Sequence, residues 1–228
     1  MHPTSDGGCR VVATALTKSL DPVVLLAPTT MTAEPATCVV VRGPNGAGKT
    51  TFLRLVAGLL EPTSGTVTID GVPADERHPT TRSSVAALIG APAAYRDLTL
   101  ADHLTLIDAT WGRDPDTCDV RVMGALEEFG IDHLDERYPH ELSSGQGQLF
   151  RLALTWFRPA RLLVLDEPEQ RLDTERRALV GRLVRERAAT GTTVVIACHD
   201  PVLTADVADQ VVDIPGDEPT AERDGDDA

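Results

Sequence analysis

The sequence predicts an α/β fold with a mostly parallel central sheet, N-terminal β strands and an inserted α-helical lobe. Short apolar runs that suit buried parallel strands occur at 38–41, 162–165 and 193–197. Helical stretches alternate with these runs toward both ends of the chain. Because strand–helix–strand alternation is typical of parallel sheets, this order of elements favours the α/β class.

The N-terminal half is expected to combine strands with one helix, and the middle to be mostly helical. Residues 1–35, rich in Thr, Pro and Val, are expected to form a few short strands. A helix is predicted from Lys49 to about Leu59, with Gly58 near its end. Residues 66–71 alternate in polarity and end in Asp-Gly, which predicts a strand and a tight turn. The helical lobe is expected over about 91–157. The remaining predicted helices are 100–109, 117–129, 143–157 and 174–190.

Length and composition indicate one domain over 1–216 and an acidic tail over 217–228, which we expect to be disordered. The 35 acidic and 21 basic residues give a net charge of -14, which argues against a nucleic-acid partner because phosphate neutralisation needs a basic face. No apolar run is long enough to span a bilayer, and no secretory signal is predicted. The four cysteines lack paired spacing, which favours reduced thiols.

Residues 43–50 read Gly-Pro-Asn-Gly-Ala-Gly-Lys-Thr and fit the pattern G-x-x-x-x-G-K-[ST] between a predicted strand and a predicted helix. Glycines allow the backbone N–H groups to surround a phosphate, Lys49 is expected to reach the β and γ phosphates, and Thr50 to place its hydroxyl on Mg²⁺. The alternative is a glycine-rich turn with a chance lysine, although lysine occurs only twice in the chain. This phosphate loop predicts a P-loop NTPase fold. The predicted nucleotide-binding residues are Gly43, Pro44, Asn45, Gly46, Ala47, Gly48, Lys49, Thr50 and Thr51.

Two carboxylates, Asp166 and Glu167, follow the apolar run at 162–165. A carboxylate at the end of a neighbouring parallel strand can hold Mg²⁺, so Thr50 and Asp166 are the predicted metal residues. Glu167 is placed to orient or deprotonate an attacking water. An apolar run followed by Asp-Glu is also common at helix N-caps, and the phosphate loop upstream is what favours the functional interpretation.

Two further features lie near strand or helix ends. The segment Leu142-Ser143-Ser144-Gly145-Gln146 opens a predicted helix and offers a second anion site, although an ordinary N-cap explains Ser143 or Ser144 equally well. His199 follows the run at 193–197, at the edge of the sheet where ligands bind in such folds.

Together these motifs resemble the ATP-binding subunits of ABC transporters over residues 36–212. The phosphate loop, the Leu142–Gln146 signature segment, Asp166-Glu167-Pro168, Leu172-Asp173 and His199 occur in family order. The resemblance implies ATP and Mg²⁺ as cofactors and two copies that close head to tail around ATP. Each site would take the phosphate loop of one copy and Ser143 and Gly145 of the other.

The resemblance also implies roles for single residues. Glu167 would be the general base, Lys49 and His199 would contact the γ-phosphate, and Asp173 would couple the two sites at the dimer interface. The helical lobe would dock on a separate transmembrane permease subunit. The chain would then lie on the cytoplasmic face of the membrane, and its ATP hydrolysis would power transport.

Two departures from the family pattern stand out. Family members carry a glutamine or glutamate near the position of Gly90, yet the first glutamine here is Gln146. An aromatic ring that commonly stacks on adenine upstream of the phosphate loop is also missing, because no Phe, Tyr or Trp precedes Phe52. Arg10 is one candidate for a replacement contact.

These departures keep other functions open. One alternative is a regulatory or low-turnover partner in a heterodimer, which the missing glutamine favours and the intact Glu167 opposes. Another is a soluble ABC-type ATPase without a transport role, although the chain lacks the doubled domain, long insertion and basic surface of such proteins. Import or export, and a homodimer or heterodimer, are equally compatible with the motifs.

Overall fold

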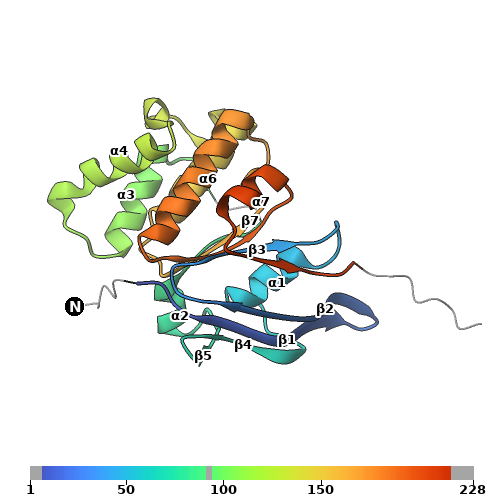
Figure 1. Cartoon of the computed structure of the whole chain (residues 1–228). Helices are drawn as coiled ribbons and strands as arrows, with labels where there is room; N and C mark the ends of the chain where they lie inside the picture. Colours follow the sequence, from blue (N-terminus) through green and yellow to red (C-terminus); the bar gives the residue numbers. More distant parts are fainter. Residues whose placement is uncertain (1–6, 91–93, 217–228) are drawn as a thin grey trace, which may run out of the picture.

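The computed structural model describes residues 7–90 and 94–216, and Figure 1 shows their arrangement in layers. A parallel sheet lies in the middle, an antiparallel sheet lies below it, and helix α1 packs between the two. The other long helices cover the opposite side of the parallel sheet. The predicted acidic tail, 217–228, lies outside the described residues.

The central sheet has five strands, all parallel, in the order β6-β7-β8-β3-β9. Its inner strands are apolar and buried on both faces, as the continuous apolar runs predicted. Because the strands are parallel, their carboxyl ends lie at one edge. The bounds are β3 Cys38–Arg42, β6 Val85–Leu88, β7 Leu162–Asp166, β8 Thr193–Ala197 and β9 Gln210–Asp213.

The second sheet is antiparallel, with the order β2-β1-β4-β5. The expectation of short strands over 1–35 is wrong, because β1 (Val11–Leu20) and β2 (Val23–Ala33) form a long hairpin. Register shifts along β1, together with a positive φ of 46° at Ala15, interrupt the alternating pattern that would have marked one long strand. The remaining strands are β4, Ser64–Ile69, and β5, Val72–Pro73.

Helix α1 (Lys49–Val56) joins the two sheets into one core. Phe52, Leu53 and Leu55 are fully buried against side chains of both sheets. Gly58, with φ at 74°, follows the last turn in the left-handed conformation that commonly ends helices. Since β3 leads directly into this helix, the core fixes the phosphate loop at both of its ends.

The far face of the parallel sheet is covered by α5 (Ser144–Trp156), α6 (Thr174–Ala189) and α7 (Pro201–Val207). Among the described residues, five helices and strands were not predicted from the pattern: α2 (Pro79–Ser84), β5, β6, α7 and β9. All are short or lie at a sheet edge, so they carry too few residues to show a clear period.

The helical lobe contains α3 (Leu100–Thr110) and α4 (Cys118–Glu128), with short 3₁₀ turns at 115–117, 132–134 and 139–141. Its polar centre is Asp108, whose side chain is 3% exposed. Arg121 Nε donates to Asp108 Oδ1 at 2.9 Å, and Arg113 Nη1 donates to the same oxygen at 3.2 Å. These hydrogen bonds, mainly those from Arg121, hold the pKa of Asp108 below its usual range despite burial.

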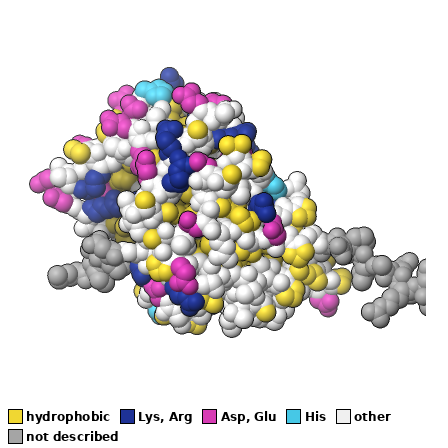
Figure 2. All heavy atoms as spheres, viewed as in Figure 1, with side chains coloured by type: hydrophobic (Ala, Val, Ile, Leu, Met, Phe, Trp, Pro, Cys, Tyr) yellow, Lys and Arg dark blue, Asp and Glu magenta, His cyan; other side chains and the backbone are white. Residues whose placement is uncertain are grey.

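Acidic and basic side chains are interspersed on the face shown in Figure 2, and several acidic ones lie along the outer edge of the helical lobe. Within residues 7–90 and 94–216, no helix has the length and apolar character needed to cross a membrane. The four cysteines are free thiols.

Asp108→Asn tests the buried ion pairs of the lobe. It should lower the free energy of unfolding at pH 7 by about 2 kcal/mol, because two guanidinium groups lose their carboxylate. For a domain of this size that corresponds to a Tm lower by about 4–8 °C. Since the folded pKa is lowered, the difference should disappear as the pH falls through it. Asp119→Asn, an exposed aspartate of α4, is the matched control; equal Tm values for the two variants would contradict the prediction.

Candidate nucleotide-binding site

The phosphate loop lies at the carboxyl edge of the central sheet, between β3 and α1. Gly48 has φ at 94°, and a β-carbon there would collide with the carbonyl oxygen of Leu25 in β2. A β-carbon at Gly43 would meet the carbonyl oxygen of Ile214 at 2.5 Å. Only glycine allows this close approach. The loop is therefore held against β2 on one side and the end of β9 on the other.

Lys49 lies within this loop and is 6% exposed. Its Nζ donates to the carbonyl oxygens of Gly43 at 2.9 Å and Pro44 at 3.0 Å. A buried ammonium is costly unless it is paired, and these oxygens satisfy it only partly. The arrangement gives the loop a fixed positive charge that suits a phosphate.

Thr50 and Asp166 meet across the site. Thr50 Oγ1 donates to Asp166 Oδ2 at 2.7 Å, while the Oδ1 atom of Asp166 is buried and has no hydrogen-bond partner among the described residues. Burial, and secondarily the charge of Glu167, raises the pKa of Asp166. Hydroxyl and carboxylate oxygens are the ligands that Mg²⁺ prefers, and the unpaired oxygen is suited to the ion or to a water bound to it. The donor set thus fits Mg²⁺.

Glu167 begins the turn after β7, with φ at 49°. Its backbone N–H donates to the Ala197 carbonyl oxygen at 2.9 Å, so the turn is tied to the end of β8. Its Oε1 lies 3.0 Å from His199 Nε2, and Gln170 Nε2 donates to its Oε2. Glu167 and His199 share an open cleft of about 610 Å³ with Asn45 of the phosphate loop.

The structure does not bring every predicted residue to this cleft. Ser143 and Ser144 are exposed at the start of α5, where Ser143 accepts a hydrogen bond from the backbone of Gln146 at 3.3 Å. Asp173 is 60% exposed and caps α6 through the backbone of Arg176 at 2.9 Å. Among the described residues, no hydrogen bond joins the signature segment or Asp173 to the phosphate loop. The N-cap interpretation of Ser143 is confirmed, and the serine is also open to another molecule.

A model of the ABC transporter family matches residues 26–170, which is more than half of the chain. The chain belongs to this family. It is 35% identical over 184 residues to a putative ABC transporter ATP-binding protein of Streptomyces coelicolor, with 80% of this chain and 32% of that protein covered. It is 34% identical over 187 residues to the sulfate/thiosulfate import ATP-binding protein CysA of Brucella melitensis, with 80% and 52% covered.

Other similar proteins are also ATP-binding proteins or cassettes of ABC transporters or import systems. The putative 2-aminoethylphosphonate import ATP-binding protein PhnT of Salmonella choleraesuis is 31% identical over 212 residues, with 92% of this chain and 57% of that protein covered. The chain thus spans about a third to just over half of the length of these curated relatives. An ATP-binding subunit of an ABC transporter superposes with a TM-score of 0.80 at 25% identity, covering 90% of this chain and 85% of that one. A dimeric bacterial ABC transporter cassette, with a TM-score of 0.82 at 19% identity, shares the fold, with 90% and 94% covered.

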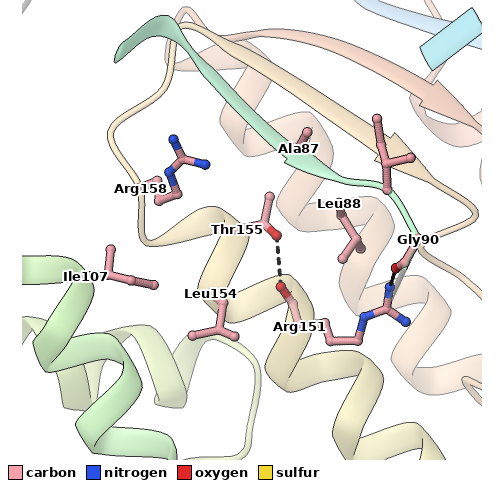
Figure 3. A pocket seen from close by; sticks show the side chains of 9 residues that line it. Ala87, Leu88, Gly90, Ile107, Arg151, Leu154, Thr155 and Arg158 are labelled. Carbon is pink, nitrogen blue, oxygen red and sulfur yellow. Dashed lines mark hydrogen bonds between the residues drawn. The ribbon is translucent and has the colours of Figure 1, made fainter. Parts of the chain in front are cut away.

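The segment after β6 leads to Gly90. Gly90, where the family glutamine is expected, has φ at 72°, and its carbonyl oxygen accepts a hydrogen bond from Arg151 of α5. Arg151 and Arg158 flank a groove of about 190 Å³ with an apolar lining that includes Leu88, Ile107 and Leu154 (Figure 3). Burial lowers the pKa of both arginines. Neither guanidinium contacts a carboxylate within the described part of the chain.

The suggested role of Arg10 at adenine is wrong. Arg10 precedes β1 and its Nε donates to Glu34 Oε1 at 2.9 Å, at the open end of the hairpin. The phosphate loop contacts Leu25 and Leu26, near the closed end. At about 3.3 Å per residue, the length of β1 separates Arg10 from that end by roughly 30 Å.

Several side chains at the site were not predicted, among them Arg171, Arg177 and Asp200 in the lining of the cleft. Three others are Glu169, Gln170 and Arg151. Each contacts a predicted residue or position, respectively His199, Glu167 and Gly90. Sequence spacing places Glu169 and Gln170 in the turn after Glu167, but nothing in that spacing tells which of them points inward.

The substitution Asp166→Asn should raise the stability of the nucleotide-free protein and weaken its Mg²⁺-dependent binding of nucleotide. Because the folded pKa of Asp166 is raised, its ionised form destabilises the protein without nucleotide at neutral pH. The variant should therefore have a Tm a few degrees higher at pH 7, and this gain should vanish below the folded pKa, where the wild-type side chain is protonated. Mg²⁺-dependent nucleotide affinity should fall by about tenfold or more. Calorimetry and nucleotide titration measure the two effects; a lower Tm with unchanged affinity would contradict both.

Proposed function

We propose that this cassette binds and hydrolyses ATP and powers transport through a separate transmembrane permease subunit. One observation carries the proposal: Lys49, the Thr50–Asp166 pair and the Glu167–His199 pair all lie at one edge of the sheet. Phosphoryl transfer to water needs a cation, oxygens that bind a metal ion, and a carboxylate beside an imidazole.

Each group has a role that follows from its chemistry. Lys49 binds the β and γ phosphates together with the loop amides, and the residues that hold Mg²⁺ are Thr50 and Asp166. That ion neutralises charge on the phosphate oxygens when it is bound. Glu167 orients the attacking water and accepts its proton, and His199 donates a hydrogen bond from Nε2 to the carboxylate or to the γ-phosphate.

The exposed signature segment supports a head-to-tail dimer. Ser143 and Ser144 are exposed at the N-terminus of α5, where the partial positive charge of the helix favours an anion. We infer that Ser143 and Gly145 of one copy complete the ATP site of the other, with Asp173 at the interface between them.

The groove beside β6 supports a membrane partner. Its apolar lining, and two guanidinium groups that contact no carboxylate of the described residues, suit an apolar segment of a permease that carries a carboxylate. Such docking would hold the chain at the cytoplasmic face of the membrane. CysA and PhnT are named as import proteins, which favours import here.

A low-turnover partner in a heterodimer is the second candidate. Gly90 has no side chain to contact Mg²⁺ or the attacking water, and Arg151 instead binds its carbonyl oxygen. This observation supports slow hydrolysis or a partner that supplies the active site.

Glu167→Gln in the purified full chain tests the function. It should reduce ATP hydrolysis by about 100-fold or more, because a general base is lost, while ATP still binds. Lys49→Ala should instead lose ATP binding. Glu136→Gln, an exposed glutamate of the lobe, is the matched control. Hydrolysis unaffected by Glu167→Gln would refute the role of Glu167, and ATP binding without turnover in the wild type would select the low-turnover alternative.

The adenine contact can be tested separately. Leu20, Val23 and Val24 are exposed at the closed end of the β1–β2 hairpin, where β2 meets the phosphate loop. We propose that this aliphatic tip replaces the missing aromatic ring. Leu20→Tyr should lower the Kd for ATP by about fivefold or more, since base stacking contributes about 1–3 kcal/mol. Inorganic triphosphate should gain nothing. Val120→Tyr, at an exposed valine of α4, is the control, and an equal gain in both variants would contradict this placement.

A further inference from the structure

Glu169 is a buried carboxylate beside the Glu167–His199 pair that the proposed chemistry does not use. It is 6% exposed and lies in the turn after β7. Its Oε1 accepts a hydrogen bond from the backbone N–H of His199 at 2.9 Å, while its Oε2 is buried with no hydrogen-bond partner in the described part of the chain. A carboxylate is costly to bury, and an apolar side chain would fill this place without that cost.

His199 contacts one glutamate through its backbone and another through its ring. Glu169 holds the backbone nitrogen of His199, and the imidazole of the same residue lies 3.0 Å from Glu167 Oε1. Both glutamates belong to one turn, and Gln148 of α5 donates to the Pro168 carbonyl oxygen between them at 3.0 Å. The turn is therefore anchored to α5 as well as to β7.

We propose that Glu169 is a positioning residue that keeps the His199 imidazole within hydrogen-bond reach of the Glu167 carboxylate. His199 itself is 41% exposed, and within the described residues its ring contacts only Glu167 through a polar atom. Without the bond to its backbone, the segment after β8 loses the contact that sets the distance between histidine and glutamate. The effect on turnover rests on the proposed ATPase function; the effect on geometry does not.

The neighbouring thiol adds no charge to this turn. Cys198 is buried, and burial together with the charge of Glu169 raises its pKa to about 12. The thiol thus stays protonated at neutral pH, and the carboxylate of Glu169 meets no second negative charge there.

Glu169→Leu and Glu169→Gln are the test variants in the full chain. Leucine removes the acceptor, and glutamine keeps an acceptor oxygen at nearly the same place. Glu169→Leu should lower kcat for ATP by about tenfold or more with KM within about threefold, because misplacing a catalytic group costs turnover rather than binding. Glu169→Gln should restore kcat to within about threefold of wild type. Equal losses in the two variants would overturn the proposal.

A double-mutant cycle with His199→Ala tells positioning from a merely structural role. If Glu169 acts through His199, Glu169→Leu should lower kcat no further in the His199→Ala background. Additive losses would overturn the proposal. Glu136→Leu is the matched control for adding a leucine, and Glu169→Met replaces Glu169→Leu if the leucine variant fails to fold.

A spectroscopic measurement needs no turnover. With ring-labelled histidine, the NMR resonance of His199 should shift on Glu167→Gln in the wild type, because the two side chains touch. In the Glu169→Leu background the same substitution should leave that resonance in place. A shift of equal size in both backgrounds would overturn the proposal. Loss of the coupling in a chain without ATPase activity would refute the proposed function and still support the positioning role.

Discussion

Strands β7, β8 and β3 lie side by side and parallel, and the residues of the site follow their carboxyl ends. Thr50 comes after β3 through the phosphate loop, Asp166 closes β7, and His199 follows β8. The hydrogen bonds Thr50–Asp166 and Glu167–Ala197 join these ends directly. A shift of one strand by a single residue would separate these pairs, so the register of the sheet is the constraint on which the site depends.

The buried ionic groups at this edge are costly for folding. Lys49 is held by backbone oxygens, and Asp166 and Glu169 each keep one buried oxygen with no hydrogen-bond partner over residues 7–90 and 94–216. The large apolar core around α1 offsets these costs. This incomplete pairing leaves hydrogen-bond donors and acceptors whose best partners are phosphate, a metal ion and water. A bound ligand would therefore supply the partners that the protein itself lacks.

Two surfaces away from the cleft bear on the proposed partners. The signature segment and Asp173 form helix caps, and no hydrogen bond joins them to the phosphate loop within the described residues. The groove beside β6 presents two guanidinium groups that contact no carboxylate among residues 7–90 and 94–216. A second copy and a permease subunit would supply what these surfaces lack, and both belong to the proposed function.

Sequence alone was sufficient for the parallel sheet, the phosphate loop and the family. Each depends on local order: apolar runs mark buried strands, and the positions of Gly43, Gly48 and Lys49 follow from the backbone path around a phosphate. The hairpin of β1 and β2 was not predictable, because bulges break its period. Only the tertiary structure decided that Glu169 faces His199, that Arg151 reaches Gly90 and that Arg10 lies far from the loop. Some of these contacts join residues that are distant in sequence, and others depend on the direction in which a turn residue points. Packing against other elements determines both the pairing and the direction, and no local sequence pattern records that packing.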